Sequence, residues 1–286
     1  MENLSVSDKT LQVPPLEEIV ETLLVEAGCG APPTNENRLL DFLNLRQLSF
    51  DFMQDPELAR VAVKQDIRAV LSLNHRVVAT QPGLNPKRKR FGILHEIGHF
   101  INHEHLQKLF YDTDETLSWY THVRIEREAN ETAAQLLFQG NRFTEEAISL
   151  PLSAHTPIKL APTFDASYEA SLRRYTERHV LPCALIVFDK KKTAKLPGDT
   201  EDDIPELRLQ YTITSAPFRR KYFSGLEAGS SVLETDLLPD GSHWGTSNIV
   251  EGTLNVRGNE RNWVFETEVF SNGYKIFQFL VRETKS

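Results

Sequence analysis

Apolar residues recur at spacings of three and four in several stretches of this chain, a pattern that predicts helices with one buried face. We predict helices over residues 14–27, from Asn85 to beyond His99, and over residues 120–139. Asn85 and Pro86 are typical of a helix cap followed by proline at the first helical position. The apolar faces of these helices comprise Leu16, Ile19, Val20, Leu23 and Leu24; Phe91, Leu94, Ile97 and Ile101; and Ala129, Ala133, Leu136 and Leu137.

Shorter stretches before the second helix have the composition of strands. Residues 45–53 predict one strand, and residues 67–73 and 76–80 predict a hairpin that turns at Asn74 and His75. The order of these elements favours a small sheet packed on one side of the second helix.

The last part of the chain alternates apolar and polar residues and predicts a mostly β module. Asn272 and Gly273 are a strong hairpin signal near its end. Before the module, residues 141–179 predict short helices, including one over residues 168–178, and residues 184–188 predict a buried strand. The predicted strands of the module cover residues 207–214, 253–256, 263–270 and 274–281.

These patterns predict an α+β protein in four segments. Residues 1–140 form a first domain, residues 141–190 a helical segment, residues 191–206 a polar linker and residues 207–286 a β-rich C-terminal domain. A chain of 286 residues is long enough for separate cores in such modules.

The second predicted helix carries His95-Glu96-Ile-Gly-His99, an H-E-x-x-H motif. Side chains four residues apart share a helix face, so His95 and His99 can present two imidazole nitrogens to one metal ion. Glu96 then lies beside an open coordination position, as in a zinc hydrolase. The alternative is a surface helix with two solvated histidines, but the capped start and the apolar face favour the metal site. Gly98 lowers helix propensity, which suggests that another backbone packs closely there.

Two candidates compete for the third protein ligand. His105 continues a longer H-E-x-x-H-x-x-G-x-x-H pattern, but that pattern includes a downstream methionine turn and both methionines of this chain lie upstream. The other candidate is a carboxylate on the helix over residues 120–139, giving a site of two histidines and one glutamate. Glu126 shares a face with Ala133, whereas Glu128 points elsewhere and is expected to be solvated. We therefore favour Glu126.

Composition and charge argue against several classes of protein. The net charge of −8 and the pI near 5.6 argue against a protein that binds nucleic acid through a basic field. The sequence has no apolar run of transmembrane length, and its polar N-terminus does not resemble a signal peptide. Cys29 and Cys183 are too few for a disulfide framework or a cysteine zinc site, so we expect a reducing, cytoplasmic location.

The motif extends to a longer pattern that resembles a known family. Arg90-Phe-Gly-Ile-Leu-His-Glu-Ile-Gly-His99 followed by Glu126-Arg-Glu-Ala-Asn130 is similar to the R-F-x-x-x-H-E-x-G-H and E-x-E-A-N helices of the ImmA/IrrE metallopeptidases. The resemblance covers residues 40–180 best and implies that Glu126 is the third zinc ligand. The chain departs from the family after the second helix, where Leu136-Leu-Phe-Gln139 stands in place of L-L-M-P.

The resemblance also implies a role for each segment. Residues 1–140 would hold a small zinc-peptidase domain, Lys159–Ala170 a helix-turn-helix-like segment, and residues 207–286 a domain similar to the sensor of the IrrE branch. Acidic residues balance the basic ones near the middle segment, so we interpret it as a packing or protein-recognition structure. These residues are Arg173, Arg174 and Arg178 against Asp165, Glu169 and Glu177.

The implied activity is that of a zinc-dependent endopeptidase. His95, His99 and Glu126 would hold Zn²⁺, with Mn²⁺ or another divalent ion as alternatives. Glu96 would take a proton from water and pass it to the leaving amine. The candidates for stabilising the oxyanion, chosen by proximity alone, are Tyr111, Tyr120 and His122.

The implied substrate is a bacterial helix-turn-helix repressor, cut to release stress-response or mobile-element genes. An acidic enzyme suits a basic, DNA-binding substrate. The rival hypothesis is a non-catalytic, ligand-sensing regulator that binds a partner on a metallopeptidase scaffold, and such a protein would not need Glu96. A DNA-binding transcription factor is disfavoured by the charge, and we expect no membrane partner.

Overall fold

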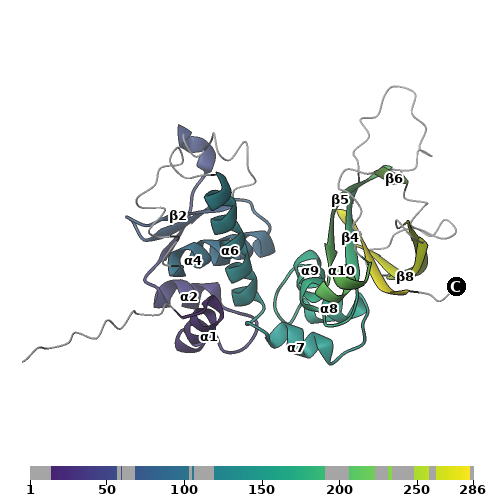
Figure 1. The fold of residues 1–286 in the computed structure, drawn as a ribbon. Helices are drawn as coiled ribbons and strands as arrows, with labels where there is room; N and C mark the ends of the chain where they lie inside the picture. The colour runs from purple at the N-terminus through teal and green to yellow at the C-terminus, as the bar shows by residue number, and fades with distance from the viewer. Residues whose placement is uncertain are drawn as a thin grey trace, which may run out of the picture. The chain divides into compact units, whose positions relative to one another are not determined.

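The computed structural model describes residues 14–56, 59, 68–102, 105, 119–190, 206–222, 231–233, 248–257 and 262–283. The chain divides into two compact units, the first unit (Met1–Gly140) and the second unit (Asn141–Ser286), whose elements are drawn in Figure 1. None of the helices in the described ranges is long and apolar enough to cross a membrane.

The first unit combines helices with a three-stranded sheet. The strand order is β1-β3-β2, and the central strand β3 pairs in parallel with β1 and antiparallel with β2. The elements are α1 (Leu16–Glu26), α2 (Glu36–Phe42), β1 (Arg46–Ser49), the 3-10 helix η1 (Phe52–Gln54), β2 (Ala69–Ser72), β3 (Val77–Thr80), α4 (Pro86–Ile101) and α6 (Trp119–Leu137).

The helix α4 contacts both the small sheet and α6 (Figure 1). Two glycines permit these close approaches. A Cβ at Gly92 would lie 3.3 Å from the Cβ of Ala69 in β2, and a Cβ at Gly98 would lie 3.0 Å from the carbonyl oxygen of Ala129 in α6. The prediction that another backbone packs against Gly98 is therefore confirmed.

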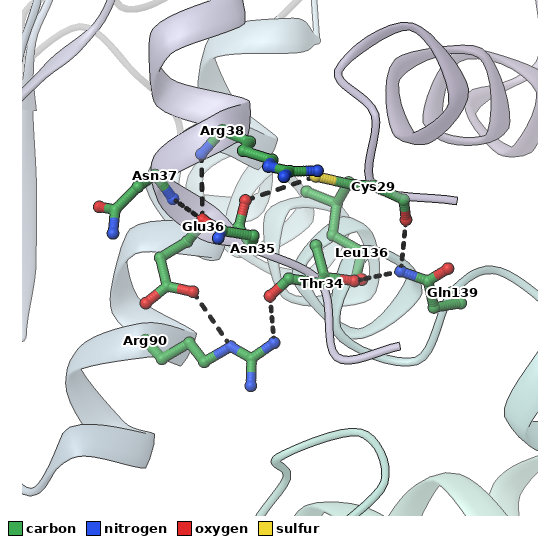
Figure 2. A network of polar contacts seen from close by, with 9 residues as sticks. All are labelled: Cys29, Thr34, Asn35, Glu36, Asn37, Arg38, Arg90, Leu136 and Gln139. Atoms are coloured by element: carbon green, nitrogen blue, oxygen red, sulfur yellow. Dashed lines mark hydrogen bonds and ion pairs between the residues drawn. The ribbon is translucent and has the colours of Figure 1, made fainter. Parts of the chain in front are cut away.

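Thr34, just before α2, joins α4 to the C-terminal end of α6, as Figure 2 shows. Its carbonyl accepts a hydrogen bond from the buried guanidinium of Arg90 in α4, whose Nε also lies 3.4 Å from the carboxylate of Glu36. The Thr34 hydroxyl donates to the carbonyl of Leu136 and accepts from the amide of Gln139, both at 2.6 Å. This network fixes how α4 lies against the end of α6.

The second unit is built on a six-stranded antiparallel sheet with the order β6-β5-β4-β9-β8-β7. On one face Tyr175 of α9 packs against Phe279, with ring centroids 5.7 Å apart. On the other face Phe218 of α10 packs against Phe265 at 5.6 Å. The elements are α7 (Arg142–Ile148), α8 (His155–Leu160), α9 (Tyr168–Arg178), β4 (Ala184–Lys190), β5 (Glu206–Thr214), α10 (Ala216–Tyr222), β6 (Ser231–Leu233), β7 (Val250–Arg257), β8 (Asn262–Ser271) and β9 (Lys275–Glu283).

The α+β class predicted from the sequence is confirmed by these helices and two sheets. The hairpin signal is confirmed as well, because the Asn272 side chain accepts a hydrogen bond from the N–H of Lys275 at 2.8 Å between β8 and β9. The strand predicted over residues 45–53 is wrong in its second half. There the Asp51 carboxylate accepts a hydrogen bond from the N–H of Met53 at 3.0 Å and caps η1 instead.

The large sheet joins strands from both sides of the predicted linker. β4 belongs to the segment predicted as residues 141–190, yet it pairs with β5 and β9, which belong to residues 207–286 apart from the first residue of β5. Residues 191–205 of the linker lie outside the described residues. The four segment boundaries therefore stay a prediction.

Candidate metal centre

The helix α4 begins at the predicted cap. The Asn85 side chain accepts a hydrogen bond from the N–H of Lys87 at 3.0 Å, and Pro86 occupies the first helical position. The helix then runs without a break through the H-E-x-x-H motif, so its two histidines lie one turn apart on the same face. The Nε2 atoms of His95 and His99 are 3.1 Å apart.

The helix α6 brings Glu126 to the same place. One carboxylate oxygen lies 3.3 Å from Nε2 of His95, and the other lies 3.4 Å from Nε2 of His99. One ligand atom from each of the three residues lies within 4.8 Å of the other two. The chain thus holds a converging group of two imidazoles and one carboxylate.

The spacing of these three donor atoms fits a metal ion. With bonds of about 2.1 Å to nitrogen and oxygen, the corners of a zinc tetrahedron lie about 3.4 Å apart. The two Nε2 atoms are 3.1 Å apart, and each lies 3.3 or 3.4 Å from a different oxygen of the Glu126 carboxylate. Two histidines and one glutamate also form a ligand set of catalytic zinc sites, in which the fourth position stays open. Other divalent ions accept the same donors, so the geometry fits a metal without selecting zinc.

The ligand side chains stabilise one another's charges. Burial lowers the pKa of His95, but the hydrogen bond with Glu126 and the negative charges of Glu96 and Glu126 outweigh it and raise the pKa. Burial raises the pKa of Glu126, but the hydrogen bonds with His95 and His99 outweigh it and hold this pKa well below its usual range. Glu126 therefore stays ionised and able to bind a cation.

Glu96 occupies a different environment in the same cluster. Its side chain is 8% exposed, and its carboxylate accepts a hydrogen bond from the backbone N–H of Leu71 in β2. Burial raises the pKa of Glu96, against the smaller effects of His95 and His99. A buried carboxylate with a raised pKa accepts a proton more readily than a solvated one, which suits a general base.

His105, the competing candidate ligand, does not join the group of three. Its side chain is fully buried and its Nε2 lies 3.0 Å from the carboxylate of Glu128, which also pairs with Arg124 at 3.2 Å. Glu128, expected to be solvated, is 28% exposed, but its carboxylate is paired with these two residues. The side chain does point away from the Glu126 face, but that side of α6 is covered by a buried histidine from beyond the end of α4.

The other candidates of the cluster are not tested by the structure. Tyr111 lies outside the described residues, and so do the side chains of Tyr120 and His122. The proposed oxyanion contacts of the tyrosines and of His122 therefore stay predictions.

Charged side chains of the helix-turn-helix-like segment make contacts within the second unit. Arg174 in α9 is 2% exposed. The carboxylate of Glu169 accepts hydrogen bonds from the hydroxyl of Tyr211 in β5 and from the ammonium of Lys275 in β9. These contacts favour the interpretation of the segment as a packing structure.

Sequence reasoning missed two contributors to the centre. Leu71 acts through its backbone N–H, which no side-chain pattern reveals, although the predicted hairpin did place this strand beside the metal helix. Thr34 acts through a carbonyl and a hydroxyl from a loop far from the motif. The partner of Thr34 is Arg90, which belongs to the Arg90–His99 motif. A buried arginine needs a hydrogen-bond acceptor nearby, so Arg90 was the signal in the sequence that could have pointed to such a contact.

Residues 48–176 match the Peptidase M78 family, described as the IrrE N-terminal-like domain. The match contains both helices of the metal centre and extends to α9 in the second unit. No curated protein matches the chain.

A solved structure resembles most of the chain. It is described as a Mycobacterium tuberculosis transcriptional regulator, with a TM-score of 0.53 and 13% sequence identity, and the likeness covers 95% of this chain and 88% of that one. At this identity the likeness concerns the fold. The H-E-x-x-H helix and the glutamate helix lie inside the family match, and residues 48–176 of this chain are therefore a domain of the ImmA/IrrE family of metallopeptidases.

Proposed function

We propose that this protein is a zinc-dependent endopeptidase in which His95, His99 and Glu126 hold the metal and Glu96 is the general base. The observation that carries the proposal is the convergence of three donor atoms beside a buried carboxylate. Membership of residues 48–176 in a metallopeptidase family supports it.

The side chains of the cluster suit peptide hydrolysis. Zn²⁺ held by these donors would polarise a carbonyl oxygen and lower the pKa of a water molecule. Glu96 is oriented by the Leu71 N–H and takes a proton from the attacking water, which it then delivers to the leaving amine. The side chains of His95 and Glu126 are 16% and 42% exposed, so a peptide can approach the cluster from solvent.

The proposed substrate is a bacterial helix-turn-helix repressor whose cleavage would release stress-response or mobile-element genes. The family resemblance supports this choice, and the net charge of −8 suits a basic, DNA-binding substrate. Cys29 and Cys183 are both free and buried, which suits the reducing cytoplasm as the place of action.

The direct test measures metal content and cleavage in the same preparations. We expect the wild type and Glu96→Gln to bind one zinc ion per chain and Glu126→Ala to bind none. Against a panel of helix-turn-helix repressors, we expect the wild type to cut and Glu96→Gln to lose at least about 100-fold in rate, because its amide cannot accept the proton. Glu131→Ala, on the same helix, is the matched control and should behave as the wild type.

Two results would contradict the proposal in different places. Retention of the metal by Glu126→Ala would show that the third ligand is another residue. Wild-type cleavage by Glu96→Gln would show that the reaction does not use this base.

A second candidate is a non-catalytic regulator that senses a ligand on a metallopeptidase scaffold. It is favoured by the fold likeness to a transcriptional regulator, which covers 95% of the chain. In that case substitution of His95 or His99 would change partner binding, while Glu96→Gln would change nothing. Duplex DNA binding that weakens steeply with salt would point instead to a direct role at DNA.

A further inference from the structure

We propose that His105 and Glu128 form a support that fixes the imidazole ring of His99 for metal binding, with Glu128 as a positioning residue. This inference rests on the metal site of the proposed function. It gives separate roles to the two glutamates of Glu126-Arg-Glu128: the first contacts the metal ligands directly, and the second acts through His105.

The support touches His99 through a ring contact. The ring centroids of His99 and His105 are 5.2 Å apart and their planes are tilted by 55°. His105 is fully buried and His99 is 6% exposed, so this contact is shielded from solvent. Movement of His105 would therefore open space directly beside a metal ligand.

Glu128 fixes the position of His105. One carboxylate oxygen lies 3.0 Å from Nε2 of His105, and the other accepts a hydrogen bond from Arg124 at 3.2 Å. The backbone carbonyl of Glu128 also accepts a hydrogen bond from the hydroxyl of Thr132 at 2.8 Å. With both oxygens engaged, the carboxylate has little freedom to rotate, and His105 is held in one orientation.

His99 needs such a support because its second ring nitrogen has no hydrogen bond to orient it. A metal-binding histidine usually donates that N–H to a carboxylate, a carbonyl or a water molecule, which fixes the ring. Among the described residues, Nδ1 of His99 is buried without a hydrogen-bond partner. The orientation of the His99 ring therefore depends on packing. Two rings pack against it: that of the fellow ligand His95, with centroids 4.7 Å apart, and that of His105, which is not a ligand.

Helix geometry explains why Glu128 supports the site but does not join it. Residues two apart lie on nearly opposite sides of a helix, so Glu126 and Glu128 cannot face the same atom. Glu126 reaches the Nε2 atoms of the two α4 histidines, while Glu128 reaches the histidine that follows α4. His105 is not part of the converging group, in which ligand atoms of His95, His99 and Glu126 lie within 4.8 Å of one another.

The test measures metal binding in variants of the full chain, without an activity assay. Glu128→Ala removes the acceptor, Glu128→Gln retains an oxygen that can accept from His105, and His105→Ala removes the ring. Glu131→Ala and His75→Ala are the controls in the same unit. The readouts are the zinc dissociation constant from chelator competition, the visible absorption of the Co²⁺-loaded protein, and the melting temperature of the metal-free protein.

We expect Glu128→Ala and His105→Ala to weaken zinc binding by about 10- to 100-fold and to alter the Co²⁺ spectrum. Glu128→Gln should recover most of the affinity, and the controls should match the wild type. Glu128 is 28% exposed, so its variants should fold even if His105→Ala does not.

Two outcomes would overturn different statements. If Glu128→Ala lowers the melting temperature but keeps the wild-type zinc affinity and Co²⁺ spectrum, the pair is merely structural and the inference falls alone. If the wild type itself binds neither zinc nor cobalt, the metal site falls, and the proposed function and the inference fall with it.

Discussion

At the scale of single residues, the environment gives similar side chains different chemistry. Glu96 and Glu126 belong to the same cluster, yet the pKa of Glu96 is raised, chiefly by burial, whereas the pKa of Glu126 is lowered because its hydrogen bonds with two imidazoles outweigh burial. One carboxylate is thus suited to accept a proton and the other to hold a cation. The difference follows from their surroundings, because Glu96 is buried within the first unit whereas Glu126 lies beside the Nε2 atoms of two histidines.

A pH dependence is expected from two residues of the second unit. Burial raises the pKa of the Cys183 thiol from 9.0 to about 12 and that of the Tyr175 hydroxyl from 10.0 to about 12. A raised pKa means that the folded state favours the neutral form of the group. The stability that these two neutral groups give to the second unit is therefore present below pH 9 and is lost as the pH rises towards 12. Urea unfolding of the second unit should therefore show falling stability between pH 9 and 11. Cys183→Ala should reduce that fall, and an equal fall in both proteins would contradict the assignment to the thiol.

The buried guanidinium of Arg90 is expected to stabilise the first unit. Arg90→Met removes the hydrogen bond to the Thr34 carbonyl and the ion pair with Glu36, which should lower the free energy of unfolding by about 1–3 kcal/mol. Arg88→Met, an exposed position in the same turn, is the control and should change it little. Equal values for the two variants in urea unfolding would show that the network in Figure 2 contributes nothing.

At the scale of elements, the close packing of α4 on α6 sets the distance between the metal ligands. Gly98 lies between the two histidine-bearing turns and the backbone of Ala129, and Thr132 packs beside it. A side chain at this position would separate the two helices. The glycine is therefore part of the metal centre although it holds no ligand atom.

Gly98→Ala tests this packing. A Cβ there would meet the Ala129 carbonyl at 3.0 Å and the Cβ of Thr132 at 3.1 Å. Overpacking of about 1–3 kcal/mol should exceed the gain of about 1 kcal/mol in helix propensity. We expect a lower melting temperature and weaker zinc binding. Gly30→Ala, where a Cβ would meet nothing within 4 Å, should change neither quantity, and wild-type zinc affinity in Gly98→Ala would show that the helices can adjust.

Much of the element level could be predicted because local signals agree with the fold. The helix over residues 168–178 and the Asn272 hairpin are fixed by periodicity and turn chemistry, which act within a few residues. The end of β1 could not be predicted, because a side chain of Asp51 replaces strand pairing with a cap. The metal ligands are suggested by spacing on helices, but the roles of Leu71 and His105 depend on contacts between segments that no local pattern encodes.

At the scale of the whole molecule, the metal centre lies entirely in the first unit. Its candidate ligands come from α4 and α6, and none comes from the second unit. Ligand binding stabilises the unit that contains the site and leaves an independent unit unchanged.

Calorimetry of the full chain should therefore show two transitions. Zinc at about 100 times its dissociation constant should stabilise the first unit by about 2.7 kcal/mol and leave the transition of the second unit in place. Glu126→Ala should abolish the shift. An upward shift of both transitions by zinc would show that the two units unfold as one.

The order of strands in the large sheet has a consequence for synthesis. β4 (Ala184–Lys190) is central and pairs with β5 on one side, but its other neighbour is β9 (Lys275–Glu283), so its second edge stays unpaired until the last strand has been translated. The ligands of the first unit, by contrast, all lie between residues 95 and 126. Because non-local pairing is slow and domains fold as units during translation, we expect the metal centre to form on the ribosome before the sheet of the second unit is complete.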